Sequence, residues 1–458
     1  MKKTRSRNTV ILVGLIILLT LAACNSGGQS APASESTTAS ESTPTSQSDQ
    51  NNRITEKTTI TVWVFGPTEG RRAGAEWLVE NFKDVNPNVD VVLQYEDFAS
   101  FSTKLLPAVA GGSPPDVLLN SGTNTFQLAH YEYLEPLDAY IERDGYPVGS
   151  IAESFWTDAS YYNGSRYTLP YGAFTYNFII RPETFEAAGL SAPTDWKDLP
   201  EIAKQLTDGD NSMWGLHLTN YPYYLYQVWK SWDADMTLVR EENGKKVPGF
   251  VSDKVIEATE WYLNLFKVDG VSPPTTPTDI DGQIPAMWIS GQVAMSVAGV
   301  PIWTTMFDEQ DVSYEMIVPN PLFTGPEGMG HYSDVQCMVI FRDIPDMNKE
   351  AAWAFISWAS QGEGAYGNML RQGSIPLDVE AQDLLLSEKK TYQYYVDSIN
   401  TATWASSFEP GAQNTMLNRG GHAFQTLSSA WRGEMTAEEF VHDLARVLQE
   451  ELDEFYGQ

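Results

Sequence analysis

Apolar and polar positions change period several times along the chain, and these changes predict alternating strands and helices. Residues 59–65 form a β-branched and aromatic run, a glycine-containing turn follows, and residues 73–82 carry apolar side chains at helical spacing. The same order returns in strand 89–93, a helix at 101–110 that Pro107 is expected to bend, and strand 117–119. Strands and helices that alternate at this spacing predict βαβ units and a mostly parallel sheet.

Later segments continue the pattern and predict a second α/β lobe. Helices are expected at 187–206, 253–266 and 349–360, and strands at 292–297 and 337–341. The last segment, 436–455, carries its apolar residues on one helical face, with Thr436 as the expected N-cap and two glutamates in the first turn. We therefore expect a terminal amphipathic helix that packs on one lobe.

The first residues show the three-part pattern of a secretory signal. Basic residues at 2–7 precede an apolar run at 10–21, which is shorter than the about 20 residues needed to span a bilayer. The run closes with Leu21-Ala22-Ala23-Cys24, which resembles the bacterial lipobox. The pattern predicts a signal peptide at 1–23 and a lipidated Cys24, with palmitate among at least two acyl chains that together attach the chain stably. The alternative, an uncleaved apolar anchor, would need a longer run and no cysteine there.

Residues 24–57 are rich in Ser, Thr, Ala, Gln and Pro and contain almost no large apolar side chain. Such a composition buries too little apolar surface to fold, so we expect a disordered tether. As a flexible coil, this tether would let the folded part move on the order of 30 Å from its lipid.

Composition limits the fold and the partners. The residues after the tether exceed the size at which a single core stops growing, so two or more lobes are expected. With 29 basic and 60 acidic residues, the formal charge of −31 repels phosphate backbones, and we expect no nucleic-acid partner. Cys337 is the remaining cysteine after Cys24 and lies in an apolar run, so we expect an inert core thiol and no intramolecular disulfide.

Short motifs in a fixed order add a resemblance to a known family. In chain order they are Asn86-Pro87-Asn88-Val89-Asp90-Val91; Ala110-Gly111-Gly112-Ser113-Pro114-Pro115-Asp116-Val117; Leu134-Glu135-Pro136-Leu137-Asp138; Tyr167-Thr168-Leu169-Pro170-Tyr171-Gly172; Phe185-Glu186-Ala187-Ala188-Gly189-Leu190; Pro193-Thr194-Asp195-Trp196-Lys197-Asp198-Leu199; and Gly291-Gln292-Val293-Ala294-Met295. Together they resemble the extracellular solute-binding proteins of the maltose and multiple-sugar type, which are the binding components of ABC importers.

This resemblance implies a two-lobed α/β fold of the type II periplasmic-binding-protein kind, in which crossover hinge segments join the lobes and a ligand is held between them. It suggests that residues 58–168 plus 342–384 form lobe 1, and that residues 169–341 plus 385–458 form lobe 2. One departure is visible: Ile180-Arg181-Pro182 stands where the family usually has Tyr-Asn-Lys, so contacts near that position cannot be carried over.

Candidate ligand-binding residues come from two sources. Ligands of open α/β sheets lie beyond the carboxyl ends of the strands, and the loops after the first and third strands there hold Phe65, Glu69, Asn120 and Ser121. The family resemblance adds Tyr171, Tyr176, Trp303, His331, Asp334 and Trp404.

The chemistry of this set suits a sugar. Aromatic rings can lie on the C–H faces of a pyranose, while amides, hydroxyls and carboxylates can bind its hydroxyl groups. The candidate loops contain neither Lys nor Arg, which disfavours a phosphorylated or anionic ligand.

These features predict a binding protein that performs no chemistry and needs no cofactor or metal. We expect it to capture a mono- or oligosaccharide and to deliver it to the transmembrane subunits of an ABC permease. It should act as a monomer on the extracellular face of the cytoplasmic membrane, held there through its lipid alone. The long tether favours a Gram-positive envelope.

Two alternatives remain open at this point. A secreted carbohydrate-active hydrolase could hide a catalytic carboxylate pair among the 60 acidic residues, since sequence does not give carboxyl spacing. A ferric-iron or other solute-binding protein is suggested by the adjacent tyrosines at 161–162, 223–224 and 394–395, although the histidines show no metal-ligand spacing.

Overall fold

The computed structural model of the chain describes residues 53–97, 100–121, 125–278, 284–299, 316–400, 404–405, 409–412, 415–416 and 421–458. The predicted signal peptide, Cys24 and Trp303 lie outside these ranges. The side chains of Asn120, Ser121 and Trp404 are also outside the description, although their backbones belong to strands.

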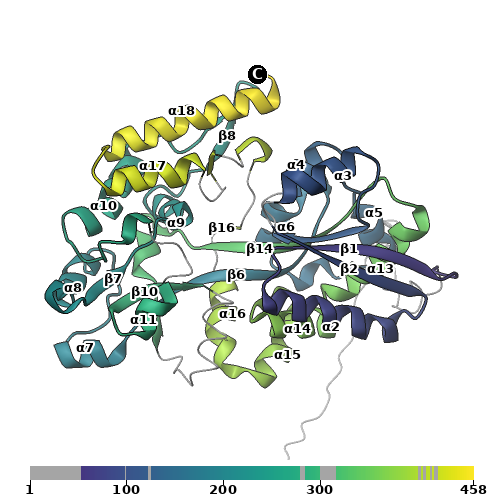
Figure 1. Cartoon of the computed structure of the whole chain (residues 1–458), viewed down its shortest axis with the longest axis horizontal. Helices are drawn as coiled ribbons and strands as arrows, with labels where there is room; N and C mark the ends of the chain where they lie inside the picture. Colours follow the sequence, from purple (N-terminus) through teal and green to yellow (C-terminus); the bar gives the residue numbers. More distant parts are fainter. Residues whose placement is uncertain are drawn as a thin grey trace, which may run out of the picture. The chain divides into compact units, whose positions relative to one another are not determined.

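Within the described ranges, one mixed sheet of ten strands organises the chain (Figure 1). Its main order is β2-β1-β3-β14-β6-β10-β7, with β11 and β15 paired to β6 and with β16 paired to β14. The strands of this sheet are β1 (Thr58–Phe65), β2 (Val89–Glu96), β3 (Val117–Ser121), β6 (Leu169–Ile180), β7 (Trp214–His217), β10 (Val293–Gly299), β11 (Ile317–Val318), β14 (Tyr332–Ile340), β15 (Ile375–Pro376) and β16 (Trp404–Ala405).

Helices surround this sheet, and none in the described ranges is long and apolar enough to cross a membrane. They are α2 (Glu69–Val85), α3 (Leu106–Ala110), α4 (Thr125–His130), α5 (Asp138–Asp144), α6 (Glu153–Ala159), α7 (Pro182–Ala188), α8 (Leu199–Gln205), α9 (Pro222–Trp232), α10 (Asp253–Lys267), α11 (Ile284–Ile289), α13 (Asp346–Ala359), α14 (Gly362–Gln372), α15 (Val379–Glu388), α16 (Gln393–Asn400), α17 (His422–Trp431) and α18 (Ala437–Tyr456).

The sheet is parallel at its two ends and antiparallel in its middle. β1 pairs in parallel with β2 and β3, and β10 pairs in parallel with β7, as the alternating pattern predicts. β14 runs antiparallel to both β3 and β6, and β6 runs antiparallel to β10. The two parallel groups are therefore joined through the β6–β14 pair.

Two large cores pack against this sheet. In the first core, Ile60, Val62 and Val64 of β1 pack with α2, α13 and α14, while Phe65 points into a smaller cluster on the opposite face with α3 and α4. This alternation is the period-two pattern of a strand that is covered on both faces. The second core contains apolar residues of β6, β7, β10, α9, α10, α17 and α18.

Several expectations from the pattern are confirmed. Strands form at each predicted place, and Cys337 is 0% exposed, where burial raises the pKa of its thiol to about 12. The terminal helix α18 begins after Thr436, whose side chain accepts from the Glu439 amide while Glu439 accepts from the Thr436 amide. This reciprocal pair is a capping box, which satisfies two amides that the helix itself cannot.

The predicted helix at 187–206 is wrong in its continuity. α7 ends at Gly189, whose φ of 66° is the left-handed conformation that favours glycine, and α8 starts again at Leu199. The break was not predicted because apolar residues at helical spacing stand on both sides of it.

Folding also starts earlier than the composition of the tether predicts. Ile54 is 1% exposed and packs in the first core. Near the other proposed lobe boundary, Tyr395 and Ile399 of α16 pack in the first core as well. The division of the chain into lobes at 168/169, 341/342 and 384/385 stays a prediction.

Asp144 ties the start of the described chain to the first core. Its carboxylate is fully buried and accepts from Arg53 at 2.6 and 3.0 Å, from Arg143 at 2.9 Å and from the Trp353 indole at 2.8 Å. Burial alone would raise the pKa of Asp144, but hydrogen bonds from Arg143, Arg53 and Trp353 outweigh it and lower the pKa.

Asp144→Asn should lower the free energy of unfolding by about 2 to 3 kcal/mol at neutral pH, because it removes the buried anion that both arginines bind and leaves them the partly exposed Glu350. Since the folded-state pKa is depressed, this contribution is present above the usual Asp pKa of about 4 and is lost as pH falls further. Urea unfolding between pH 7 and pH 3 measures it. Equal stability of the two proteins at pH 7 would contradict this account.

Candidate functional site

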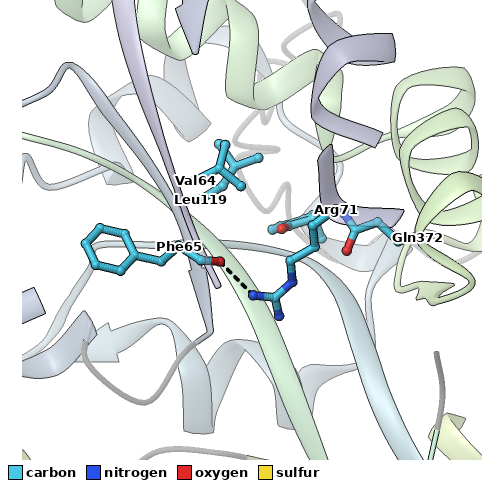
Figure 2. A pocket seen from close by; sticks show the side chains of 6 residues that line it. Val64, Phe65, Arg71, Leu119 and Gln372 are labelled. Atoms are coloured by element: carbon cyan, nitrogen blue, oxygen red, sulfur yellow. Dashed lines mark hydrogen bonds between the residues drawn. The ribbon is translucent and has the colours of Figure 1, made fainter. Parts of the chain in front are cut away.

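The carboxyl end of β1 places an arginine at the centre of the candidate site. β1 ends at Phe65, and Thr68 then caps α2, so that Arg71 lies in the first turn of the helix. Arg71 donates to the Phe65 carbonyl at 2.8 Å, and Figure 2 shows the Phe65 ring pointing away from the guanidinium. Phe65 thus contributes its backbone oxygen here, while its ring is 0% exposed in the core.

A small pocket lies beside this arginine. It is lined by Val64, Phe65, Arg71, Leu119, Tyr171 and Gln372, and its open space of about 10 Å³ is roughly that of one water molecule (Figure 2). Its floor is apolar and comes from β1 and β3, whereas its polar walls come from α2, β6 and the end of α14. A single hydroxyl-sized group therefore fits the pocket.

Two opposing effects act on the guanidinium of Arg71. Burial lowers the pKa of Arg71, while the nearby groups of Tyr171 and Asp334 oppose this effect. An arginine with a lowered pKa is still protonated at neutral pH, so the pocket carries a positive charge with a carboxylate close by. Burial raises the pKa of Tyr171 to about 12, so this hydroxyl stays neutral and can donate.

Two buried glutamines lie next to Arg71 and Tyr171: Gln372 lines the pocket, and Gln336 contacts the Tyr171 hydroxyl. Tyr171 donates to Gln336 Oε1 at 3.1 Å, and Gln372 donates to Asn368 at 2.8 Å. The second polar atom of each amide, Gln336 Nε2 and Gln372 Oε1, is buried and forms no hydrogen bond within the described part of the chain. Such buried orphan groups are costly, and they are the atoms that a bound hydroxyl group or water would satisfy.

A stack of tyrosines forms the other part of the site. Tyr176 and Tyr332 have ring centroids 6.2 Å apart at 15°, and Tyr332 and Tyr223 are 5.6 Å apart at 25°. Tyr332 is buried in the middle of the stack, and Tyr176 and Tyr223 on either side of it are half-buried; Tyr223 also packs on Tyr221, with ring centroids 4.8 Å apart. Burial first, then the neighbouring tyrosines and Asp334, raises the pKa of Tyr223 well above its usual value, so the stack is neutral.

Asp334 connects the polar pocket with the tyrosine stack. It acts electrostatically on Arg71, on the side of the first core, and on Tyr223, at the start of α9 in the second core. Asp334 therefore lies within electrostatic range of both the polar pocket and the tyrosine stack.

His331 is buried beside Thr175 of β6. Its ring is 4% exposed, and its Nε2 lies 2.9 Å from the Thr175 hydroxyl, which in turn lies 2.8 Å from the Ser398 hydroxyl. The arrangement joins β6, α16 and the start of β14. Burial lowers the pKa of His331 to about 4, and a hydrogen bond to the Tyr176 backbone only partly opposes this.

The structure brings some of the sequence-predicted residues together. Phe65, Tyr171 and Asp334 surround Arg71, and Tyr176 stands in the tyrosine stack. Glu69 is exposed at the first position of α2, two residues before Arg71. Trp404 is placed by its backbone alone, which pairs with Tyr332. Whether these residues, or Asn120, Ser121 and Trp303, contact a ligand stays a prediction.

Sequence reasoning missed Arg71, Gln336 and Gln372, and it considered Tyr223 only in a metal-binding pair. The candidate loops contain no arginine, as expected, but the loop after β1 was taken to end at Glu69, and Arg71 in the first turn of α2 lies at the same edge. A helix that begins directly after a strand-end loop was the available signal for Arg71.

Comparison with known proteins identifies the family. The family described as bacterial extracellular solute-binding protein matches residues 67–365, which is well over half of the chain. The chain belongs to this family. An Escherichia coli K12 protein, YcjN, provisionally named an ABC transporter periplasmic-binding protein, is 24% identical over 158 residues. That match spans 32% of this chain and 35% of YcjN, so the chain aligns with about a third of this relative.

Solved structures share the fold of this solute-binding protein. MalE of Xanthomonas citri, a sugar-binding protein, matches with a TM-score of 0.72 and 20% identity, over 87% of this chain and 98% of its own. Lmo0181 of Listeria monocytogenes, in complex with cycloalternan, matches with a TM-score of 0.69 and 21% identity, over 88% and 100%. A Thermotoga lettingae solute-binding protein bound to α-D-tagatose matches with a TM-score of 0.69 and 19% identity, over 86% and 99%. These likenesses confirm the type II two-lobed fold.

The buried imidazole of His331 should make stability depend on pH. Because the folded-state pKa lies below the usual 6.5, the unfolded chain binds a proton first as pH falls, and stability drops by about 2 kcal/mol between pH 7 and pH 5. His331→Gln should remove this part of the slope in chemical unfolding. Parallel stability curves for the two proteins would contradict a neutral buried His331.

Proposed function

We propose that this chain is a sugar-binding component of an ABC importer, and that it captures a neutral, hydroxyl-rich ligand between its two cores. The observation that carries the proposal is the pocket of Arg71, Tyr171 and Gln372, which offers hydrogen-bond donors next to an unsatisfied acceptor. A hydroxyl group both donates and accepts, so it matches both kinds of partner.

Charged ligand groups fit this pocket less well. A carboxylate or phosphate accepts only, and it would face both Gln372 Oε1 and the Asp334 carboxylate. An ammonium donates only, and it would face the Arg71 guanidinium. The electrostatic interaction of Asp334 with Arg71 thus supports a neutral ligand even though a cation is present at the site.

The tyrosine stack provides the apolar counterpart. Its half-buried rings, Tyr176 and Tyr223, are suited to the C–H faces of a sugar ring, as each aromatic contact adds about 0.5 to 1.5 kcal/mol. The cycloalternan and tagatose complexes of structural neighbours agree in ligand class with this chemistry. A ligand that touches both cores binds the closed state better than the open state, and a permease can recognise that difference in shape.

The alternative of ferric-iron binding finds less support. In the described part of the chain, no three His, Cys, Asp or Glu side chains gather as metal ligands. Of the paired tyrosines, Tyr224 is buried in the second core, and Tyr223 has a raised pKa that disfavours the phenolate.

A neutral sugar should therefore bind with micromolar or better affinity, about −8 kcal/mol or more. The measurement is intrinsic tryptophan fluorescence titrated with neutral mono- and oligosaccharides, among them tagatose and cycloalternan, with uronic acids and ferric iron in parallel. Gln372→Met should weaken sugar binding about tenfold, since it removes the acceptor that the ligand hydroxyl needs.

Gln382→Met is the matched control, because Gln382 is equally buried but lies outside the pocket. Its affinity should equal that of the wild type. A response to iron or a uronic acid without a response to any neutral sugar would refute the proposed ligand class.

We further propose that Cys24 carries the lipid that holds the protein at the outer face of the membrane. The lipobox-like Leu21-Ala22-Ala23-Cys24 supports this. Cys24→Ala should move the protein from the membrane fraction to the medium or periplasm after cell fractionation, while sugar affinity stays the same. Equal membrane retention of the two proteins would instead indicate an uncleaved apolar anchor.

A further inference from the structure

The smaller cluster around α4 meets the second core away from the β6–β14 pair. α4 belongs to the first half of the chain, where Leu128 and Ala129 pack with Phe65 and Leu105. α18 packs in the second core through Leu444, Leu448 and Leu452. The last residue of α4 and the last turn of α18 are nevertheless in direct contact.

Aromatic rings form this contact. The Phe455 ring lies 4.8 Å from the His130 ring and 5.7 Å from the Tyr131 ring, and the Tyr456 ring lies 5.4 Å from His130 at 85°. Gly411 packs closely on Phe455, since a Cβ added at Gly411 would stand 3.1 Å from Phe455 Cβ.

A chain of hydrogen bonds runs through the same contact. His130 Nδ1 lies 2.7 Å from the Tyr162 hydroxyl, which is hydrogen-bonded to the Tyr456 hydroxyl. Tyr456 also donates to Glu409, and Glu409 pairs with Lys246 of the second core at 3.3 Å. The polar path therefore crosses from α4 and β4 (Tyr161–Tyr162) to α18 and β9 (Lys245–Pro248).

The structure assigns a conformational role to this contact: we propose that His130, Tyr131, Tyr162, Phe455 and Tyr456 form an aromatic latch that holds the smaller cluster and the second core together without help from the ligand. The latch joins elements that share neither a strand nor a core, so any hinge motion that separates the smaller cluster from the second core must break it. It acts whether or not the ligand is a sugar.

A latch of this kind changes ligand affinity by changing the fraction of protein that is in the closed state. The apparent dissociation constant equals the intrinsic constant divided by the fraction of closed protein, so each contact that favours closure strengthens binding by the same factor. Sequence changes at the tip of α18 would then adjust affinity and release rate without altering any group that touches the ligand.

Ligand-free small-angle scattering and hydrogen exchange test the latch. Phe455→Ala and Tyr456→Phe should each increase the radius of gyration of the ligand-free protein, and should raise the exchange of α4 amides about three- to tenfold. Phe455 and Tyr456 are only half-buried, so melting temperature and far-ultraviolet circular dichroism should change little. His130→Ala, on the opposite side of the contact, should reproduce the same increases.

Two matched controls separate the latch from general loosening. Phe266→Ala truncates a partly buried aromatic residue that packs on Trp431 in the second core, and Tyr394→Phe removes an exposed hydroxyl on α16. Both should scatter and exchange like the wild type. Equal scattering of Phe455→Ala, Tyr456→Phe and the wild type would overturn the latch, and so would an increase of the same size in Phe266→Ala.

Discussion

The antiparallel pairing of β6 with β14 is the interaction on which the rest of the molecule depends. β6 supplies Tyr171, Ala173 and Ile179 to the first core and Phe178 and Ile180 to the second, so one continuous strand contributes to both. Its register with β14 shifts between Gln336 and Cys337, where the pairing passes from the polar part of β14 to its apolar part. Backbone hydrogen bonds thus fix the relative position of two groups of side chains that would otherwise belong to separate bodies.

The period of a strand explains how the site is assembled on this pair. Tyr332, Asp334 and Gln336 are spaced by two residues, so they share one face of β14. Tyr332 stacks between tyrosines, Asp334 acts on both Arg71 and Tyr223, and Gln336 accepts from Tyr171. One strand therefore carries the middle of the tyrosine stack, the linking carboxylate and the glutamine beside the polar pocket, while its other face packs Val335 in the first core.

Sequence predicted the elements better than it predicted the site. Apolar periodicity depends on local spacing, so strands and the capped helix α18 could be recognised from their own residues. The expected strand at 337–341 began too late, because Tyr332, Asp334 and Gln336 break the apolar run that defined it. Those same polar residues build the site. Partners such as Gln336 and Tyr171 are 165 positions apart, and no local pattern states that they meet.

The net charge of the chain and the charged groups of the site act on a ligand over different distances. At physiological ionic strength the Debye length is about 8 Å, so the formal charge of −31 acts on a ligand mainly before it enters the site. Within the pocket, the buried guanidinium of Arg71 interacts strongly with any ligand charge, and without Asp334 it would favour an anion. Asp334 opposes that preference at close range, while the net negative surface opposes it at long range. Both effects disfavour anions, and the binding free energy of a neutral ligand must then come from hydroxyl pairing and ring contact, for which the orphan amide atoms and the tyrosine stack are suited.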